Sequence, residues 1–300
     1  MAPRVDLTAH HGRYDYSPLP ARPVYDWPNG RRLAVYIAVN VEWFAFGQGL
    51  GAELAPGGPP PDVLNYAWRD YGNRVGIWRL LGLLDRLSLP ACGLLNSAIY
   101  QYCPQIPAAF RRRGDEIVGH GRSNAERQGT LPEAEEARLI DDATQVIRDA
   151  EGQPPAGWLG PWISESVHTP DLLQARGYRY LLDWCMDDQP VWMKTQGGRI
   201  LAVPYPQELN DIPAIVARRV SAGEFADMIV DQFDEMRDQA ADGPLVMGIA
   251  LHPYIVGQPF RLRALGKALT HISAHRERIW LTRSGAIAEH SIGLPAGTVP

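Results

Sequence analysis

The chain has 300 residues, of which 45% are hydrophobic and 21% charged, and its formal net charge is −5. This composition is that of a globular protein, and a chain of this length buries enough surface to fold as one large α/β domain. Because the longest block of basic residues is the run 111–113, we expect no nucleic-acid partner.

The 29 Gly and 26 Pro residues are about half as many again as an average composition of roughly 12% would give. No period of three accompanies them, so they predict shaped loops rather than a collagen helix. Three cysteines without a C-x-x-C pair predict buried thiols in a reducing compartment. Neither a signal sequence nor a membrane-spanning apolar run is present, so we expect a cytoplasmic protein without a membrane partner.

Three segments are expected: an N-terminal arm over 1–30, a barrel domain over 31–290 and a C-terminal tail over 291–300. The arm is aromatic and rich in proline, and we expect it to lie over the domain or over a neighbouring subunit of a homo-oligomer. The segment 31–44 is a nearly continuous apolar run, typical of a strand buried on both faces. The loop 47–72 is long enough to be a functional loop.

From residue 73 onward, helix and strand patterns alternate. The first helix pattern, 73–87, places one apolar face on Val75, Trp78, Leu81, Leu84 and Leu87. Further strands are expected at 89–97, 115–121, 155–161, 178–184, 198–206, 244–253 and 278–282. Further helices are expected at 104–114, 131–152, 169–177 (with Thr169 as N-cap), 221–240 (with a capping box from Ser221 and Glu224) and 260–276.

This alternation predicts a parallel sheet with crossover helices, either an open doubly wound sheet or a (β/α) barrel. In both folds ligands bind at the carboxyl ends of the strands. The side chains expected there are Asn40, Glu42, Asn96, His120, Trp158, Asp183, Trp184, Tyr205, Glu208 and His252. Such a polar and aromatic set contributed by many strands favours the barrel.

Several common sites are excluded. The chain has no G-x-G-x-x-G after the first strand, no phosphate-binding P-loop and no G-x-S-x-G elbow. His271 and His275 are spaced like a metal pair, but they fall within a helix far from the strand ends. We therefore interpret them as part of a solvated helix face.

Seven motifs together resemble the polysaccharide deacetylase (NodB-homology) family, and within it the cytoplasmic, allantoinase-like branch. They are VNVEW, DYGNRVGIWRLLGLLDRL, DEIVGHGRSN, GWLGPWISES, YLLDWCMDDQP, VPYPQELND and LHPYIVGQPFR, and they span most of the chain in the expected order. The resemblance implies a distorted (β/α) barrel of about seven parallel strands. It also implies hydrolysis of an amide carbon–nitrogen bond, usually with a divalent metal such as zinc.

The resemblance also implies roles for individual residues. Glu42 falls at the family's metal-binding Asp and Asn40 at its general-base Asp. His120 and Asn124 fall at the family's H-x-x-x-H pair, and Leu159 falls where an Arg is common. Asp183 matches the acid that orients a late histidine, and His252 matches that histidine, which protonates the leaving amine.

Two departures bear on the metal. Asn40 cannot act as a base, and Asn124 is a poor ligand beside an imidazole, so Glu42 and His120 alone would hold zinc weakly. Either no transition metal is tightly bound, which we favour, or other residues complete the site. The candidates are Asp187, Asp188 and Glu126.

We therefore expect a hydrolase of non-peptide carbon–nitrogen bonds whose substrate is a small ureide, imide or N-acetylated sugar. Glu42 or Asp183 would activate water, while His252 and His120 would supply a proton or stabilise the oxyanion. The alternatives are a metal-dependent N-deacetylase of an acetylated sugar and a degenerate barrel that binds a carbohydrate or metabolite without turnover.

Substrate contacts are expected from Asn40 and Asn124. Trp158 and Trp162 would stack on a sugar or ureide ring, or else pack in the barrel mouth. Glu208 would line the pocket, and Asp211 is expected to cap the following helix.

Overall fold

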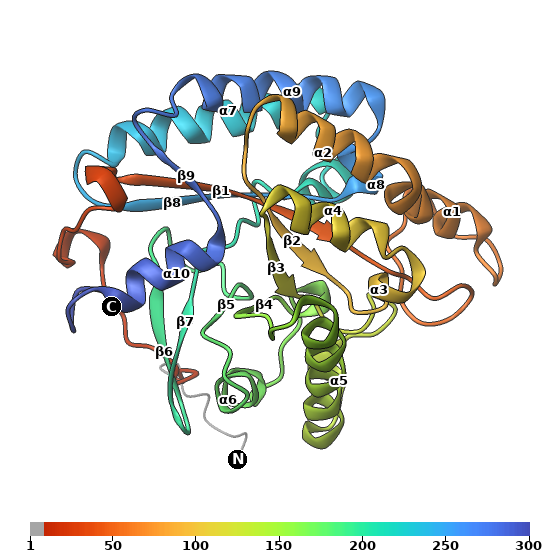
Figure 1. Ribbon diagram of the computed structural model, residues 1–300, viewed down its shortest axis with the longest axis horizontal. Helices are drawn as coiled ribbons and strands as arrows, with labels where there is room; N and C mark the ends of the chain where they lie inside the picture. Colours follow the sequence, from red (N-terminus) through yellow and green to blue (C-terminus); the bar gives the residue numbers. More distant parts are fainter. Residues whose placement is uncertain (1–8) are drawn as a thin grey trace, which may run out of the picture.

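The computed structural model describes residues 9–300, and its centre is a curled, mostly parallel sheet (Figure 1). The spatial strand order is β6-β7-β5-β4-β3-β2-β1-β8, and β9 also pairs with β1. The strands are β1 (Leu33–Val41), β2 (Cys92–Leu95), β3 (Glu116–Gly119), β4 (Gly157–Trp158), β5 (Tyr180–Leu181), β6 (Val191–Thr195), β7 (Gly198–Ala202), β8 (Leu245–Leu251) and β9 (Trp280–Thr282). The helices are α1 (Val63–Tyr71), α2 (Ile77–Arg86), α3 (Ile99–Tyr102), α4 (Gln105–Arg113), α5 (Glu133–Glu151), α6 (Thr169–Ala175), α7 (Ala222–Gln239), α8 (Pro253–Val256), α9 (Pro259–Ala274) and α10 (Ser284–Gly293).

Strand β1 is buried along its whole length, as its apolar sequence predicts. Side chains of a strand alternate between the two faces of the sheet. Accordingly Ala34 and Tyr36 belong to the cluster inside the barrel, whereas Val35 and Ile37 pack outward. Both faces of β1 are therefore core, which is typical of parallel sheets covered by helices.

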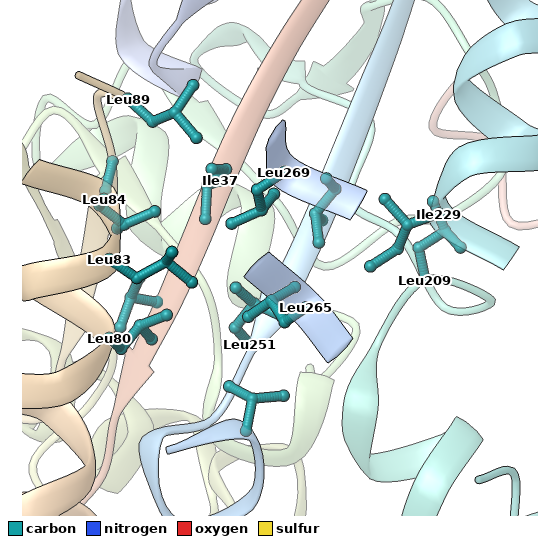
Figure 2. Close-up of a cluster of buried hydrophobic side chains, with 14 of the residues drawn as sticks. Ile37, Leu80, Leu83, Leu84, Leu89, Leu209, Ile229, Leu251, Leu265 and Leu269 are labelled. Carbon is teal, nitrogen blue, oxygen red and sulfur yellow. The ribbon is translucent and has the colours of Figure 1, made fainter. Parts of the chain in front are cut away.

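The outer cluster lies between the sheet and helices α2, α7 and α9, which cover β1 and β8 (Figure 1). Figure 2 shows this layer: Leu80 and Leu84 of α2 flank β1 on one side, and Leu265 and Leu269 of α9 pack near β8. This layer holds in place β1 and β8, the strands that end next to Glu42 and His252.

The sheet does not close by regular pairing between its edge strands β6 and β8 within residues 9–300. Isolated hydrogen bonds span the gap instead, from Val246 N to Asp188 O (2.8 Å) and from Ala250 N to Leu209 O (2.9 Å). The fold is thus the distorted α/β barrel that the sequence predicts, with one irregular seam.

Five elements are absent from the sequence prediction: β6, α1, α3, α8 and α10. The expectation of a loop over 47–72 was wrong for its last part, which forms α1. β6 pairs antiparallel with β7 as a hairpin. Val191 and Met193, two residues apart in β6, are buried while their neighbours are more exposed, which is the alternation typical of a strand. α10 was not predicted, and it places Ile287 and Ala288 in the cluster inside the barrel.

Two details of the predicted helices were wrong. Trp78 of the expected apolar face is exposed, because α2 instead buries Ile77, Leu80 and Leu83 beside Leu81 and Leu84. Thr169 is the first residue of α6 rather than its cap. By contrast, the capping box of Ser221 and Glu224 at the start of α7 is confirmed.

The described part of the expected arm, 9–30, lies against the barrel of its own chain; residues 1–8 of the arm are outside the described residues. Arg13 pairs with Asp171 (2.7 Å), and Arg22 pairs with Asp187 (2.6 Å). At the hairpin edge, the Lys194 amide of β6 donates to the carbonyl of Arg13. The expected tail begins within α10, which extends to Gly293. The homo-oligomer stays a prediction.

All three cysteines are free, but only Cys92 is fully buried and Cys185 is exposed, so the prediction of buried thiols was wrong for Cys185. Among residues 9–300, none of the helices has the length and apolar character needed to cross a membrane.

Candidate active site

A cavity of about 270 Å³ lies at the carboxyl ends of β1, β3 and β8. The residue that directly follows each of these strands lines the cavity: Glu42 after β1, His120 after β3 and His252 after β8. Its full lining is Asn40, Glu42, Ala52, His120, Asn124, Leu159, Trp162, Ile163, Tyr205, Gln207, Asn210, Ile212, Pro213, Ala217, His252 and Tyr254. The structure thus brings together Glu42, His120, His252, Asn40, Asn124 and Trp162, as the sequence predicts.

The buried carboxylate of Glu42 is the centre of this arrangement. Its Oε1 accepts a hydrogen bond from Asn124 Nδ2 (2.6 Å), and its Oε2 accepts one from the Tyr254 hydroxyl (2.7 Å). The ring nitrogens Nε2 of His252 and His120 lie 3.5 and 3.6 Å from the same Oε1. One negative charge therefore faces both histidines.

The orientation of Asn124 follows from its neighbours. A backbone amide can only donate, so the Trp43 N–H, 2.7 Å from Asn96 Oδ1, fixes which end of Asn96 is the oxygen. Asn96 Nδ2 then donates to Asn124 Oδ1 (2.9 Å), which leaves Asn124 Nδ2 facing Glu42. Asn124 thus presents a donor to the site.

The hydrogen bonds of His120 determine its tautomer in the same way. Its Nδ1 lies 2.7 Å from the carbonyl oxygen of Leu159, which can only accept, so Nδ1 carries a proton. In the neutral ring Nε2 is then an acceptor. This atom is buried and has no hydrogen-bond partner among residues 9–300.

His252 is held by Asp211, not by Asp183. Asp211 Oδ1 lies 2.6 Å from His252 Nδ1, and its Oδ2 accepts the His252 backbone N–H (2.8 Å). The expectation that Asp183 orients His252 was therefore wrong, because Asp183 bonds the backbone N–H of Gly160. The expected capping role of Asp211 was also wrong: it occupies the N-cap position of the turn Ile212–Ala217, but its side chain makes no cap hydrogen bond.

Burial and charge act against each other at these groups. Burial raises the pKa of Glu42, but His252 and His120 lower it more strongly, to about 2. Burial lowers the pKa of His252, but the carboxylates of Asp211 and Glu42 raise it further, to about 10. Burial also raises the pKa of Asp211. At neutral pH the site therefore holds an imidazolium at His252 beside the carboxylate of Glu42.

The rest of the lining is mixed. Asn40 Nδ2 donates to the Tyr205 hydroxyl (3.0 Å), and that hydroxyl donates to Asn40 Oδ1 (3.3 Å), so the two side chains hold each other in place. Trp162 is fixed by a hydrogen bond from its indole N–H to the carbonyl of Asn124 (2.9 Å). Leu159 places an apolar side chain in the wall. A small substrate with both polar and apolar edges fits this surface.

Two predicted contacts lie outside the cavity. Trp158 is fully buried, donates to Gln128 Oε1 (3.2 Å) and packs edge-on against Tyr178, so it belongs to the core. Glu208 is exposed and paired with Arg218. Both predictions were wrong, for different reasons: Trp158 leaves β4 on the side away from the cavity, whereas Glu208 lies in the loop beyond the end of β7 at Ala202.

The residues present do not fit a tightly held transition metal. Glu42 Oε1 already accepts the amide of Asn124, and an N–H donor cannot ligate a cation. Within residues 9–300, no group of three or more His, Cys, Asp or Glu side chains is arranged to hold a metal ion. The alternative ligands Asp187, Asp188 and Glu126 do not line the cavity.

Three lining or supporting residues were not predicted in their present roles: Asp211, Tyr254 and Gln207. Tyr254 follows His252 by two residues, and Gln207 and Asp211 lie in the segment after β7. They lie in the motifs VPYPQELND and LHPYIVGQPFR, but the sequence does not show which way these loops fold back onto the barrel. Gln207 Nε2 is buried without a hydrogen-bond partner among residues 9–300.

Comparisons with known proteins bear on the fold and on the predicted resemblance. No protein-family model matches the chain. A Schizosaccharomyces pombe protein named as a polysaccharide deacetylase is 27% identical over 318 residues, which cover 95% of each chain. The solved structure of the PuuE allantoinase has a TM-score of 0.80 at 25% identity and covers 95% of this chain and 97% of that one. A probable polysaccharide deacetylase from Pseudomonas aeruginosa PAO1 has a TM-score of 0.78 at 26% identity, covering 91% and 94%.

The likeness extends along nearly the whole chain in both sequence and fold. It confirms the resemblance that the motifs predict: the chain is similar in sequence and fold to proteins named as polysaccharide deacetylases, and an allantoinase is among the solved structures that share its fold.

Proposed function

We propose that the chain hydrolyses a carbon–nitrogen bond other than a peptide bond in a small polar substrate bound in the cavity. The observation that carries this proposal is the buried set of Glu42, His120 and His252, which pairs an unpartnered ring acceptor with an imidazolium. The reaction class is that of the deacetylases and the allantoinase that the chain resembles.

Each histidine has a separate task. Water attacks the carbonyl carbon while its proton passes to His120 Nε2, and the Glu42 carboxylate stabilises the imidazolium that forms. His252 gives its Nε2 proton to the leaving nitrogen as the carbon–nitrogen bond breaks. One water is consumed: its oxygen forms the new carboxyl group and the released nitrogen gains the proton, so that a cyclic ureide or imide opens to a single ureido or amide acid. Exchange with solvent restores both protonation states. Because the pKa of Glu42 is about 2, its carboxylate is a charge stabiliser rather than the base.

The cavity favours an activated amide such as a cyclic ureide or imide. Its volume of about 270 Å³ is near the lower end of small-molecule pockets, which span roughly 300–1,000 Å³. The unpartnered Gln207 Nε2 offers a donor for the substrate carbonyl and for the oxyanion that forms from it. Cyclic ureides and imides have better leaving groups than an N-acetyl sugar, so they need less polarisation of the carbonyl.

The donor set also supports turnover without a tightly bound transition metal, because Asn124 presents an N–H where a ligand would be needed. A metal-dependent N-deacetylase is the alternative. A cytoplasmic location and a homo-oligomer stay predictions from the sequence.

Turnover of allantoin, hydantoin, succinimide and N-acetylglucosamine oligomers tests the proposal. We expect hydrolysis of a cyclic ureide or imide that persists after dialysis against a chelator. His120→Gln should lower kcat/KM by about 10²–10⁴, whereas His271→Gln, on the surface of α9, should leave it unchanged.

The other outcomes separate the alternatives. Loss of activity on chelation and its recovery with zinc would establish the metal-dependent N-deacetylase. Binding without turnover across the whole panel would establish a degenerate binding barrel.

A further inference from the structure

Two carboxyl groups that the proposed reaction does not use lie together behind the cavity wall. Asp183 Oδ1 accepts the backbone N–H of Gly160 (2.7 Å), and Glu165 Oε2 accepts the indole N–H of Trp184 (2.8 Å). The remaining oxygens, Asp183 Oδ2 and Glu165 Oε1, are buried and have no donor among residues 9–300. Glu165 thus contacts the residue that directly follows Asp183, and each carboxyl group shifts the pKa of the other, so the two groups are close neighbours.

Two ionised carboxylates cannot bond each other, because both only accept. A single proton between them replaces the repulsion with a short, charge-assisted hydrogen bond. Burial favours that proton, because it raises the pKa of Asp183 and raises the pKa of Glu165 to about 7. A shared proton therefore explains both why the two oxygens have no other donor and why the two carboxyl groups can lie side by side.

The charged surroundings do not supply another partner for either free oxygen. The negative charge of Glu136 raises the pKa of both carboxyl groups, whereas Arg13 lowers the pKa of Glu165. The titratable or charged side chains that face the pair are Glu136 of α5, Arg13 and His11 of the N-terminal segment, Lys194 of β6 and Tyr205 after β7.

The pair is joined to the cavity through the turn that begins at Gly160. Trp162 and Ile163, which line the cavity, have φ angles of 65° and 51°, in the left-handed region that β-branched residues avoid. Such a conformation costs on the order of 1–3 kcal/mol and persists only where neighbouring contacts hold it. The bond from Gly160 to Asp183 holds the start of this turn.

We propose that Asp183 and Glu165 share one proton and that this pair positions Trp162 and Ile163 for substrate binding, so that loss of the proton weakens binding. Both are positioning residues, since neither lines the cavity. The inference rests on the proposed function, because it describes how the same cavity is regulated.

The test compares KM across pH in the wild-type chain and in Glu165→Gln. The glutamine amide donates to Asp183 without a titratable proton, and the reciprocal Asp183→Asn keeps an acceptor for the Gly160 N–H. In the wild type KM should rise by up to about tenfold for each pH unit above about 7, while kcat changes less. Both variants should show a flat KM, and the exposed control Glu235→Gln on α7 should follow the wild type.

A flat wild-type KM, or variants whose KM still rises with pH, would overturn the inference. An infrared titration separates this failure from failure of the proposed function. The protonated carboxyl band should disappear near pH 7 in the wild type and be missing in Glu165→Gln. Its absence from the wild type overturns the shared proton, whereas its presence without any turnover overturns only the proposed hydrolysis.

Discussion

Replacing Asp211 by asparagine is the sharpest perturbation of the proposed mechanism. The carboxylate of Asp211 contacts His252 twice, at Nδ1 (2.6 Å) and at the backbone N–H (2.8 Å). Asparagine has nearly the same shape and keeps an oxygen for the backbone N–H. Its amide nitrogen then faces His252 Nδ1, so the charge that stabilises the imidazolium is lost.

The size of the effect follows from that contact. A hydrogen bond to a charged group contributes about 1.5–3 kcal/mol, and one pKa unit corresponds to about 1.36 kcal/mol. The pKa of His252, about 10 in the native chain, should therefore fall by about one to two units. The alkaline limb of the rate profile should move down by the same amount, because His252 must be protonated to act as the acid.

The assay is kcat for the preferred ureide or imide between pH 5 and 11, because the proton shared by Asp183 and Glu165 is expected to act on KM. A nuclear magnetic resonance titration of the His252 ring accompanies it. Asp234→Asn is the matched control, because Asp234 pairs with His271 (2.9 Å) between α7 and α9, away from the cavity. An alkaline limb that stays in place in Asp211→Asn, or that moves equally in the control, refutes the assignment of His252 as the acid.

The two remaining predictions concern stability. Tyr254→Phe should lower the free energy of unfolding by about 1–3 kcal/mol, because Glu42 Oε2 loses its buried donor; urea denaturation measures this, and an unchanged midpoint contradicts it. The raised pKa of His252 stabilises the fold fully below about 6.5, and this contribution is lost as pH rises through about 10. The lowered pKa of Glu42 stabilises the fold above about 4.5, and this contribution is lost as pH falls through about 2. Urea denaturation across pH should thus show a loss of stability between about pH 6.5 and 10 that is missing in His252→Gln.

The positions of the main site residues could be predicted because the end of an apolar run in the sequence marks the carboxyl end of a parallel strand. Glu42, His120 and His252 lie next to or directly after apolar runs, and in a parallel barrel all such ends face one mouth. Trp158 and Glu208 satisfied the same rule and yet point elsewhere. The rule identifies the end of a strand, but it does not determine on which side of the wall a side chain lies.

The partners of these residues could not be predicted, since they depend on how the loops return to the barrel. Asp211 is 41 residues before His252 in sequence, and only the folded segment after β7 brings the two together. Asp183 matched the expected motif, but it follows the short strand β5 and meets Gly160 and Glu165 instead. Hydrophobic patterns carry little information about such contacts between loops.

The chain of amides from Trp43 through Asn96 to Asn124 constrains how this site can change in evolution. A histidine at position 124 would still face the Asn96 amide N–H, and it would accept that proton through one ring nitrogen. A neutral ring then carries its own proton on the other nitrogen, the one directed at Glu42. One substitution would thus install an imidazole in the tautomer that cannot ligate a cation. An imidazole that could ligate a cation at position 124 would therefore also need a change at Asn96, because the two positions are coupled through the hydrogen bond between them.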